Sequence, residues 1–417
     1  MEPCPKLSDR GGDLEFLPQR DDGRTEGGCW NGFIGRLLLL AGFIWAAGLD
    51  PWSLSQRDPA VLVGSPRMAA RQAQAVMLGM AFLQLIVAGA IAGDARAWQR
   101  RMAAWLTGLG TLLYTAGYAL MPSWSSSVWL IPAGALLNLG GFALLLEQLG
   151  RGDSPRIWLV VLPVICLGML LDVVMGLFAA NPEHFLPVYL GAEDGVRLRM
   201  LRLARAAAIA LPAVALLYEG LAACVGLRLP LARWGRAALW CGVAGMSAVL
   251  AVAAFTSVHV KFFLPLPALT TFAGTCAGAV LANRHARALE FWGWLLIAAS
   301  MGIGLFMGLY AFDGPLPAPD FLHGYNDFAR RLLRLGHAYC IVLGLLSIFI
   351  AREPDTSRFA FRTRWMGIPL FVAGSIITII AIFFVALSVL PTSALAVGPA
   401  LVAVALIPCL APYTPAR

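Results

Sequence analysis

The sequence predicts an all-α integral membrane protein with about twelve transmembrane helices, built as three tandem four-helix repeats around a pseudo-threefold axis. The chain of 417 residues is 59% hydrophobic and 13% charged, with a mean hydropathy of +0.75, whereas soluble proteins are about 25% charged. Its apolar runs are continuous rather than alternating, and a bilayer accepts such runs as helices. Three arginines that head apolar runs, Arg71, Arg202 and Arg334, lie 131 and 132 residues apart, which indicates one unit repeated three times.

The predicted helices follow from apolar runs of about 20 residues, the length that spans a bilayer. They group into repeats at 33–150, 157–285 and 288–412. Residues 1–32 are polar and glycine-containing, so we expect a disordered cytoplasmic tail rather than a signal peptide. The twelve runs begin near Phe33, Met68, Trp105, Val128, Trp158, Leu201, Ala237, Phe263, Phe291, Leu332, Trp365 and Ser393.

Each predicted repeat has the same helix boundaries. The first helix is expected to end at a turn-forming pair, namely Asp50-Pro51, Asn181-Pro182 and Asp313-Gly314. The third helix opens with a tryptophan suited to the membrane interface, namely Trp105, Trp240 and Trp365. The fourth helix carries a Pro-Ala pair, at Pro132, Pro267 and Pro399.

The distribution of charge predicts the orientation. The terminal segments and the loops on their side together hold 20 lysines and arginines, and the opposite loops hold 11. Both termini should therefore be cytoplasmic, in the plasma (inner) membrane. The net charge of +8 includes no basic stripe with interleaved aromatics, which excludes nucleic acid as a partner and leaves the lipid bilayer. Eight scattered cysteines indicate neither a disulfide framework nor a zinc site.

The candidate site lies one helical turn below the repeated arginines, where the three units carry Gln74, Arg205 and His337. His337 is the one histidine predicted inside a span, and an ionisable group there is a functional hypothesis by default. It would be an axial ligand of a haem iron. The alternative is a structural imidazole that hydrogen-bonds Tyr339, Gln74 or a backbone carbonyl.

A haem at this place would need cationic partners for its propionates. The candidates are Arg71, Arg202, Arg331 and Arg334; the alternative is that these arginines anchor the helices at the interface. Two acids also fall within the predicted spans. We expect Asp172 to be protonated or paired with an arginine of a neighbouring helix, and Glu219 to be hydrated near a cytoplasmic helix end.

The architecture resembles subunit I of the haem-copper oxidases, a family with haem ligands on helices two and ten and further haem and copper ligands on helices six, seven and ten. The segment GHAYCIVLG (336–344) is similar to the helix-ten pattern, with Tyr339 where a second histidine stands. The segment QAQAVMLG (72–79) resembles an early helix of the NnrS family, with Gln72 and Gln74 at its two histidine positions. The resemblance implies at most one b-type haem, near His337, Tyr339 and Gln74.

The departures from this family argue against catalysis. Predicted helices six and seven contain no histidine, and copper centres prefer nitrogen-rich ligation. The resemblance then implies a protein that binds one haem or serves as a non-catalytic subunit of a membrane redox complex. The alternatives are a secondary transporter or channel for a small solute, although transporters usually divide into two halves, or a membrane scaffold or assembly factor.

Overall fold

The computed structural model describes residues 26–55, 66–90, 97–121, 123–151, 158–181, 184, 195–226, 229–286, 288–310, 316–317, 328–352, 367–386 and 390–407. Within these ranges every regular element is helical. Residues 1–25 of the predicted tail lie outside them, and the first helix already begins at Glu26.

Twelve α-helices make up the described bundle, which confirms the all-α class and the number of helices. Several begin earlier than predicted because their first turns carry interfacial arginines and tryptophans rather than apolar residues. The helices are α1 (Glu26–Ser55), α2 (Pro66–Ala90), α3 (Ala97–Leu120), α4 (Leu130–Arg151), α5 (Trp158–Ala180), α7 (Val196–Val225), α8 (Pro230–Phe255), α9 (Pro265–His285), α10 (Ala288–Tyr310), α11 (Phe328–Arg352), α13 (Ile368–Ala386) and α14 (Val397–Leu406).

The protein is a polytopic membrane protein. Nine of the described helices are long and apolar enough to cross a bilayer, and shorter apolar stretches at Ala73–Ala88 and Thr392–Leu406 belong to α2 and α14. Tryptophans exposed at the two ends of the bundle fit the two membrane interfaces. Trp105 and Trp234 are 61% and 55% exposed near the starts of α3 and α8, and Trp124 is 52% exposed just after α3 ends.

One predicted helix end is wrong. Helix α1 continues through Asp50-Pro51 to Ser55, because a proline removes one backbone donor from a helix without necessarily ending it. The second prediction is confirmed, since α5 ends at Ala180, directly before Asn181-Pro182. Helix α10 ends at Tyr310, and Asp313-Gly314 lies outside the described residues.

Three of the helical hairpins have the same construction. In each, a short 3₁₀ helix precedes the second helix of the pair: η3 (Ser125–Trp129) before α4, η4 (Val258–Phe263) before α9 and η6 (Thr392–Ala396) before α14. In each, a glycine lets the two backbones touch. A Cβ at Gly110 would lie 2.7 Å from the carbonyl oxygen of Gly134, and one at Gly374 would lie 3.0 Å from that of Gly398; Gly242 packs against Thr271 in the same way.

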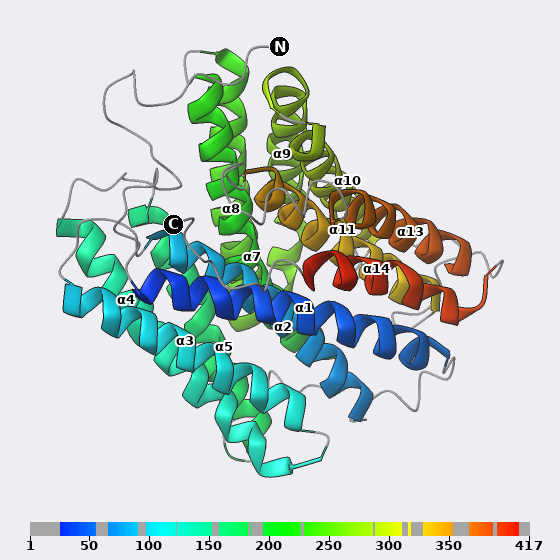
Figure 1. Cartoon of the computed structure of the whole chain (residues 1–417). Coiled ribbons are helices and arrows are strands. Elements are labelled where there is room, and N and C mark those ends of the chain that lie inside the picture. The colour runs from blue at the N-terminus through cyan, green and yellow to red at the C-terminus, as the bar shows by residue number, and fades with distance from the viewer. Residues whose placement is uncertain are drawn as a thin grey trace, which may run out of the picture.

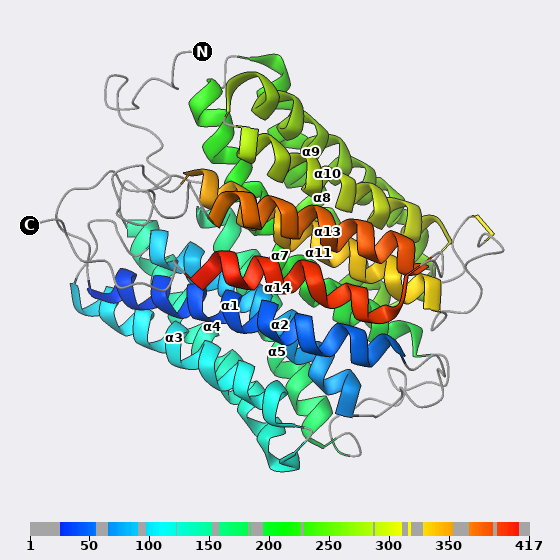
Figure 2. The ribbon, with the colours of Figure 1, turned by 45° about the vertical axis from the view of Figure 1, so that its right-hand side comes forward.

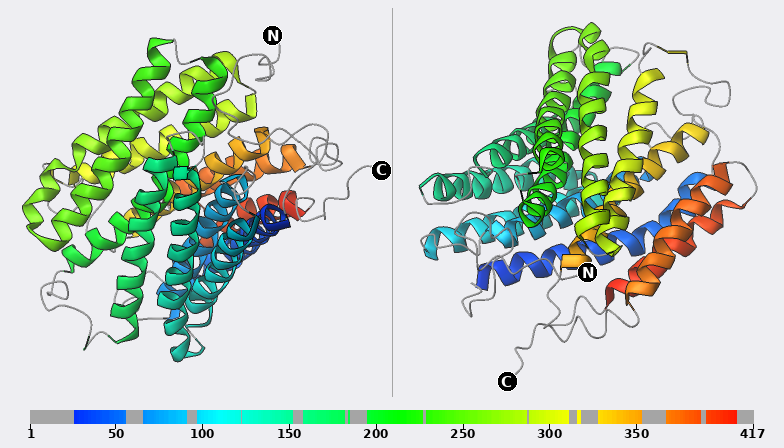
Figure 3. Two further views of the ribbon diagram at one scale, coloured as in Figure 1. Left: turned by 90° about the vertical axis from the view of Figure 1, so that its left-hand side faces the viewer. Right: turned by 90° about the horizontal axis from the view of Figure 1, so that it is seen from above.

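The first and last helices close the bundle. Helix α14 packs against α1, and Figure 1 shows the red helix α14 beside the blue helix α1. In Figure 2 the helices α9, α10, α13, α14, α1 and α3 follow one another across the molecule and run in roughly one common direction, as spans of one bilayer should. The left-hand view of Figure 3 again places α14 against α1.

Three helices, α2, α7 and α11, line the centre of the bundle. Phe82 of α2 stacks on Phe349 of α11 with ring centroids 5.9 Å apart. Arg352 of α11 donates a hydrogen bond to the backbone oxygen of Leu217 in α7 at 2.9 Å. Helices α2 and α7 also pack on each other. A helix buried on all sides reads as hydrophobic all round, and α7 is buried without interruption from Leu211 to Ala222.

Candidate functional site

The two predicted residues Gln74 and Tyr339 meet at the centre of the bundle. The side-chain amide of Gln74 donates a hydrogen bond to the Tyr339 hydroxyl at 3.2 Å, although the two residues are 265 positions apart. Gln74 is 6% exposed and Tyr339 is 3% exposed. Gln74 and Tyr339, which stand where the resembled families have histidines, are therefore in direct contact through neutral side chains.

His337 is held by Ser300 of α10. Its Nδ1 lies 2.7 Å from the Ser300 backbone oxygen and 2.9 Å from the Ser300 hydroxyl, which in turn donates to the His337 backbone oxygen at 2.8 Å. Gly304, one turn along α10, makes room for the ring, because a Cβ there would lie 2.9 Å from the His337 Cε1 atom. His337 thus contacts a backbone carbonyl, as in the structural alternative, and its Nε2 has no partner among the described residues.

The predicted arginines lie around the first turns of α7 and α11. Arg331 is 8% exposed and its guanidinium lies 5.8 Å from the ring of Phe328. Arg202 and Arg334 are half-buried, and all three have further interactions with the chain. Arg71 belongs to α2, but its side chain lies outside the described residues.

Asp172 confirms the prediction of an ion pair across helices. Its Oδ1 atom lies 3.0 Å from an Arg205 nitrogen, and the two side chains are 1% and 18% exposed. Two tyrosines of α3 complete the cluster: the Tyr114 hydroxyl donates to Asp172, and Arg205 donates to the Tyr118 hydroxyl at 3.2 Å. Arg205, at the register position of His337, is therefore committed to a buried carboxylate.

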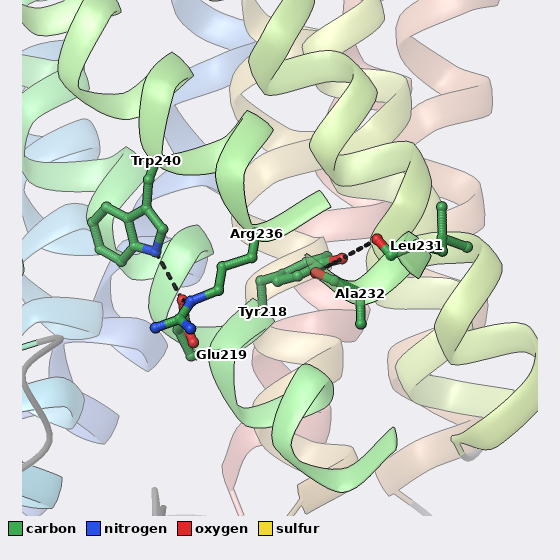
Figure 4. Close-up of polar contacts among 6 residues, drawn as sticks. All are labelled: Tyr218, Glu219, Leu231, Ala232, Arg236 and Trp240. Atoms are coloured by element: carbon green, nitrogen blue, oxygen red, sulfur yellow. Dashed lines mark hydrogen bonds and ion pairs between the residues drawn. The ribbon is translucent and has the colours of Figure 1, made fainter. Parts of the chain in front are cut away.

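Glu219 is buried, so the prediction of a hydrated side chain is wrong. Its Oε1 atom accepts hydrogen bonds from Arg236 Nε at 2.7 Å and Trp240 Nε1 at 2.8 Å, and its side chain is 1% exposed. Figure 4 shows these α8 side chains pointing at the carboxylate, with the Tyr218 hydroxyl donating instead to the Ala232 backbone. The hairpin packing of α8 on α7 supplies both donors. Trp240 is consequently part of this cluster rather than a lipid-interface tryptophan.

A third pair, Glu290 with Arg352, was not predicted. Arg352 Nε donates to Glu290 Oε1 at 3.0 Å, and the same guanidinium donates to Leu217 of α7. A Cβ at Gly220 of α7 would lie 2.7 Å from this guanidinium. The signal was available in the sequence, since Glu290 and Arg352 stand at the two ends of a predicted antiparallel helix pair, α10 and α11, that meet on one side of the membrane.

The first four helices contain a neutral network that was also missed. The amide of Asn31 in α1 donates to Gln84 in α2 and to Thr107 in α3, the latter at 3.0 Å. Gln84 donates to the Thr111 hydroxyl at 2.6 Å, and Thr111 donates to Asn138 of α4 at 3.2 Å. Amides inside apolar runs are the signal for such a network, because a buried polar group needs partners.

The remaining histidines take no part in these clusters. His184, His259 and His285 are exposed, and His259 stacks on Phe262 in η4; His323 lies outside the described residues. Across the described ranges no three histidine, cysteine, aspartate or glutamate side chains form a group that could hold a metal ion. The sequence matches no family model, and no curated protein gives a significant match.

Proposed function

We propose that the protein binds one b-type haem through His337 and is built, like subunit I of the haem-copper oxidases and the NnrS proteins, from three four-helix units. The observation that carries the proposal is the 2.7 Å contact between His337 Nδ1 and the Ser300 carbonyl. Metal-bound histidines characteristically donate their second ring N–H to such an acceptor, which fixes the tautomer and directs the other nitrogen at the metal. Here that other nitrogen is Nε2.

The three-unit architecture is supported by the repeated hairpin construction. Gly110, Gly242 and Gly374, which allow the close hairpin crossings, are each 132 residues apart, and a 3₁₀ helix follows each of their helices. The second helix of every proposed unit, α2, α7 or α11, lies at the centre. In this proposal the bundle sits in the plasma (inner) membrane with both termini cytoplasmic, as the excess of positive charge on that side favours.

The residues fit one haem and not a second. Gln74 and Tyr339 bond each other directly, which leaves no place between them for an iron, and neither is an imidazole. Among the residues that the structure describes, His337 is the fitting ligand. Arg331 and Arg334, one to two turns before it on α11, and Arg202 and Arg71 at the register positions of the other units, are the proposed partners of the propionates.

A haem supplies one-electron chemistry, and the residues of this chain hold and orient it. Ser300 fixes the His337 ring, and Gly304 admits it. Helices α7 and α8 are the sixth and seventh α-helices in chain order, and they contain no histidine that could ligate a copper centre of the oxidase type. The proposed role is thus that of a non-catalytic, electron-carrying or structural subunit of a membrane redox complex.

Visible absorption of the purified protein, oxidised and then reduced with dithionite, tests this proposal. Wild-type protein produced with haem supplied should show a Soret band that shifts on reduction, and His337→Ala should lose it. A wild-type spectrum without a haem band would refute the cofactor.

Transport of a small solute is the second candidate, and one observation favours it. Three carboxylate–arginine pairs lie within candidate spans, and intramembrane ionisable groups often mark ion pathways. Solute or proton uptake into proteoliposomes by haem-free protein would favour this function over the redox role.

A further inference from the structure

The three buried carboxylates differ in how firmly their arginine is held. The side chain of Arg236, the partner of Glu219, is 40% exposed, whereas those of Arg205 and Arg352 are 18% and 15% exposed. Arg205 also bonds Tyr118, and Arg352 also bonds Leu217. In the described structure Arg236 bonds Glu219 through its Nε alone. Arg236 is the seventh residue of α8, which begins at Pro230, so its guanidinium lies near one end of this candidate span and can reach the aqueous phase there without any helix moving.

Glu219 uses one half of its carboxylate. Both donors, Arg236 and Trp240, bond Oε1, and Oε2 is buried with no partner in the part of the chain that the structure describes. A carboxylate oxygen has lone pairs for further donors, and a buried acceptor left unpaired is costly. The carboxylate therefore has one open, water-excluded position.

We propose that Glu219 is a proton-binding site gated by Arg236. When the Arg236 side chain turns into the adjacent aqueous phase, one proton from that phase binds the carboxylate. One positive charge leaves the pocket and one enters, so the buried carboxyl group is neutralised in both arrangements. Trp240 keeps its hydrogen bond to Oε1 in each.

The other groups around Glu219 are already committed. Tyr218 on the same helix donates to the backbone of Leu231 and Ala232, and its ring packs edge-on against Trp294 of α10 at 5.7 Å. Arg352 of α11 reaches the neighbouring Gly220 but is paired with Glu290 of α10. Arg236 of α8 is thus the cation that exchanges with the proton.

Infrared spectroscopy of the protein in lipid nanodiscs tests the site, because a protonated carboxylic acid has a carbonyl band distinct from those of a carboxylate. Lowering the pH should add a band that shifts in deuterated water and that is missing in Glu219→Gln. Asp172→Asn and Glu290→Gln are matched controls, since their carboxylates face arginines that stay buried, and both should keep the band.

Arg236→Gln provides a second test that leaves Glu219 unchanged. The band should then be present already at neutral pH, and Arg236→Lys should restore the wild-type pH response. An unchanged acid-induced band in Glu219→Gln, or no band at neutral pH in Arg236→Gln, would overturn the proposal. If Glu219→Gln does not fold, as judged by gel filtration and circular dichroism, the two Arg236 variants decide.

Discussion

Helices α1–α4 and helices α5–α11 bury polar groups in different ways. Among the described residues, the buried polar side chains of α1–α4 are amides and hydroxyls, and five of them, Asn31, Gln84, Thr107, Thr111 and Asn138, form one network across all four helices. The buried polar groups of α5–α11 include the carboxylates of Asp172, Glu219 and Glu290, each beside an arginine. The same helical scaffold thus carries a neutral interior in one part and an ionised interior in the other.

This difference suggests different roles for the two kinds of buried polar group: the neutral network specifies how the helices pack, and the ion pairs are candidates for function. A neutral network in a low-dielectric interior constrains which helices pack and in which register, because each buried amide or hydroxyl needs a partner. Burying an ion pair costs desolvation free energy, and apolar side chains in its place are often as stable. Stability of the fold alone therefore does not explain why the ion pairs are present. We therefore expect mutations in helices α1–α4 to change only the stability of the fold. Mutations in helices α5–α11 should change both the stability and the charge of the buried carboxylates.

The largest effect is expected at the most enclosed ion pair. Arg205→Gln leaves the Asp172 carboxylate buried without its cation and should lower the free energy of unfolding by about 3–5 kcal/mol. Thermal unfolding in detergent measures the loss. The double variant Asp172→Asn/Arg205→Gln should recover much of it; equal losses in the single and double variants would show that the charge pair does not matter.

A smaller loss is expected from the neutral network. Gln84→Leu removes the link between Asn31 and Thr111 and leaves buried partners unpaired, which should cost about 2–3 kcal/mol. Thr115→Val is the control, since the Thr115 hydroxyl bonds only its own helix, at Thr111, and it should change stability by about 0.5 kcal/mol or less. If both variants behave alike in the same unfolding assay, the network has no structural role.

Glycine packing should be equally important in both regions. A Cβ at Gly134 would meet the backbone of Gly110 and Tyr114 at 2.5 Å, and one at Gly274 would lie 2.6 Å from Leu239. Gly134→Ala and Gly274→Ala should each cost about 1–2 kcal/mol through overpacking. Gly79→Ala, with open space around it, should leave the unfolding temperature unchanged or raise it. A loss of stability in Gly79→Ala as large as in the other two variants would contradict the hypothesis that close helix packing determines the cost of an added Cβ.

The smallest effect is expected at the pair whose cation is exposed. Arg236→Gln should cost about 1 kcal/mol or less, because the arginine is partly solvated and Glu219 can be neutralised by a proton. Comparing its unfolding temperature with that of Arg205→Gln ranks the two pairs directly. A loss at Arg236 as large as at Arg205 would mean that the two ion pairs are equally enclosed.

The sequence predicted the helices well because apolar length is a local property. It also predicted that Asp172 pairs with an arginine of a neighbouring helix, because a deep carboxylate needs a cation, but only the structure identifies that arginine as Arg205. The prediction that Glu219 is hydrated is wrong because its exposure depends on how α8 packs against α7. Its partner Arg236 is 17 residues away, on the other helix of the hairpin. Gln74 and Tyr339 were grouped by resemblance, but their hydrogen bond depends on helices 265 residues apart in the chain.

The haem-to-protein ratio of the purified wild-type protein tests whether His337 is the ligand of a haem. We expect one b-type haem per chain and none in His337→Ala. The ratio should be unchanged in Gln74→Leu, because Gln74 bonds Tyr339 rather than a cofactor. A ratio of zero, a ratio of two, or haem retained in full by His337→Ala would contradict the proposal.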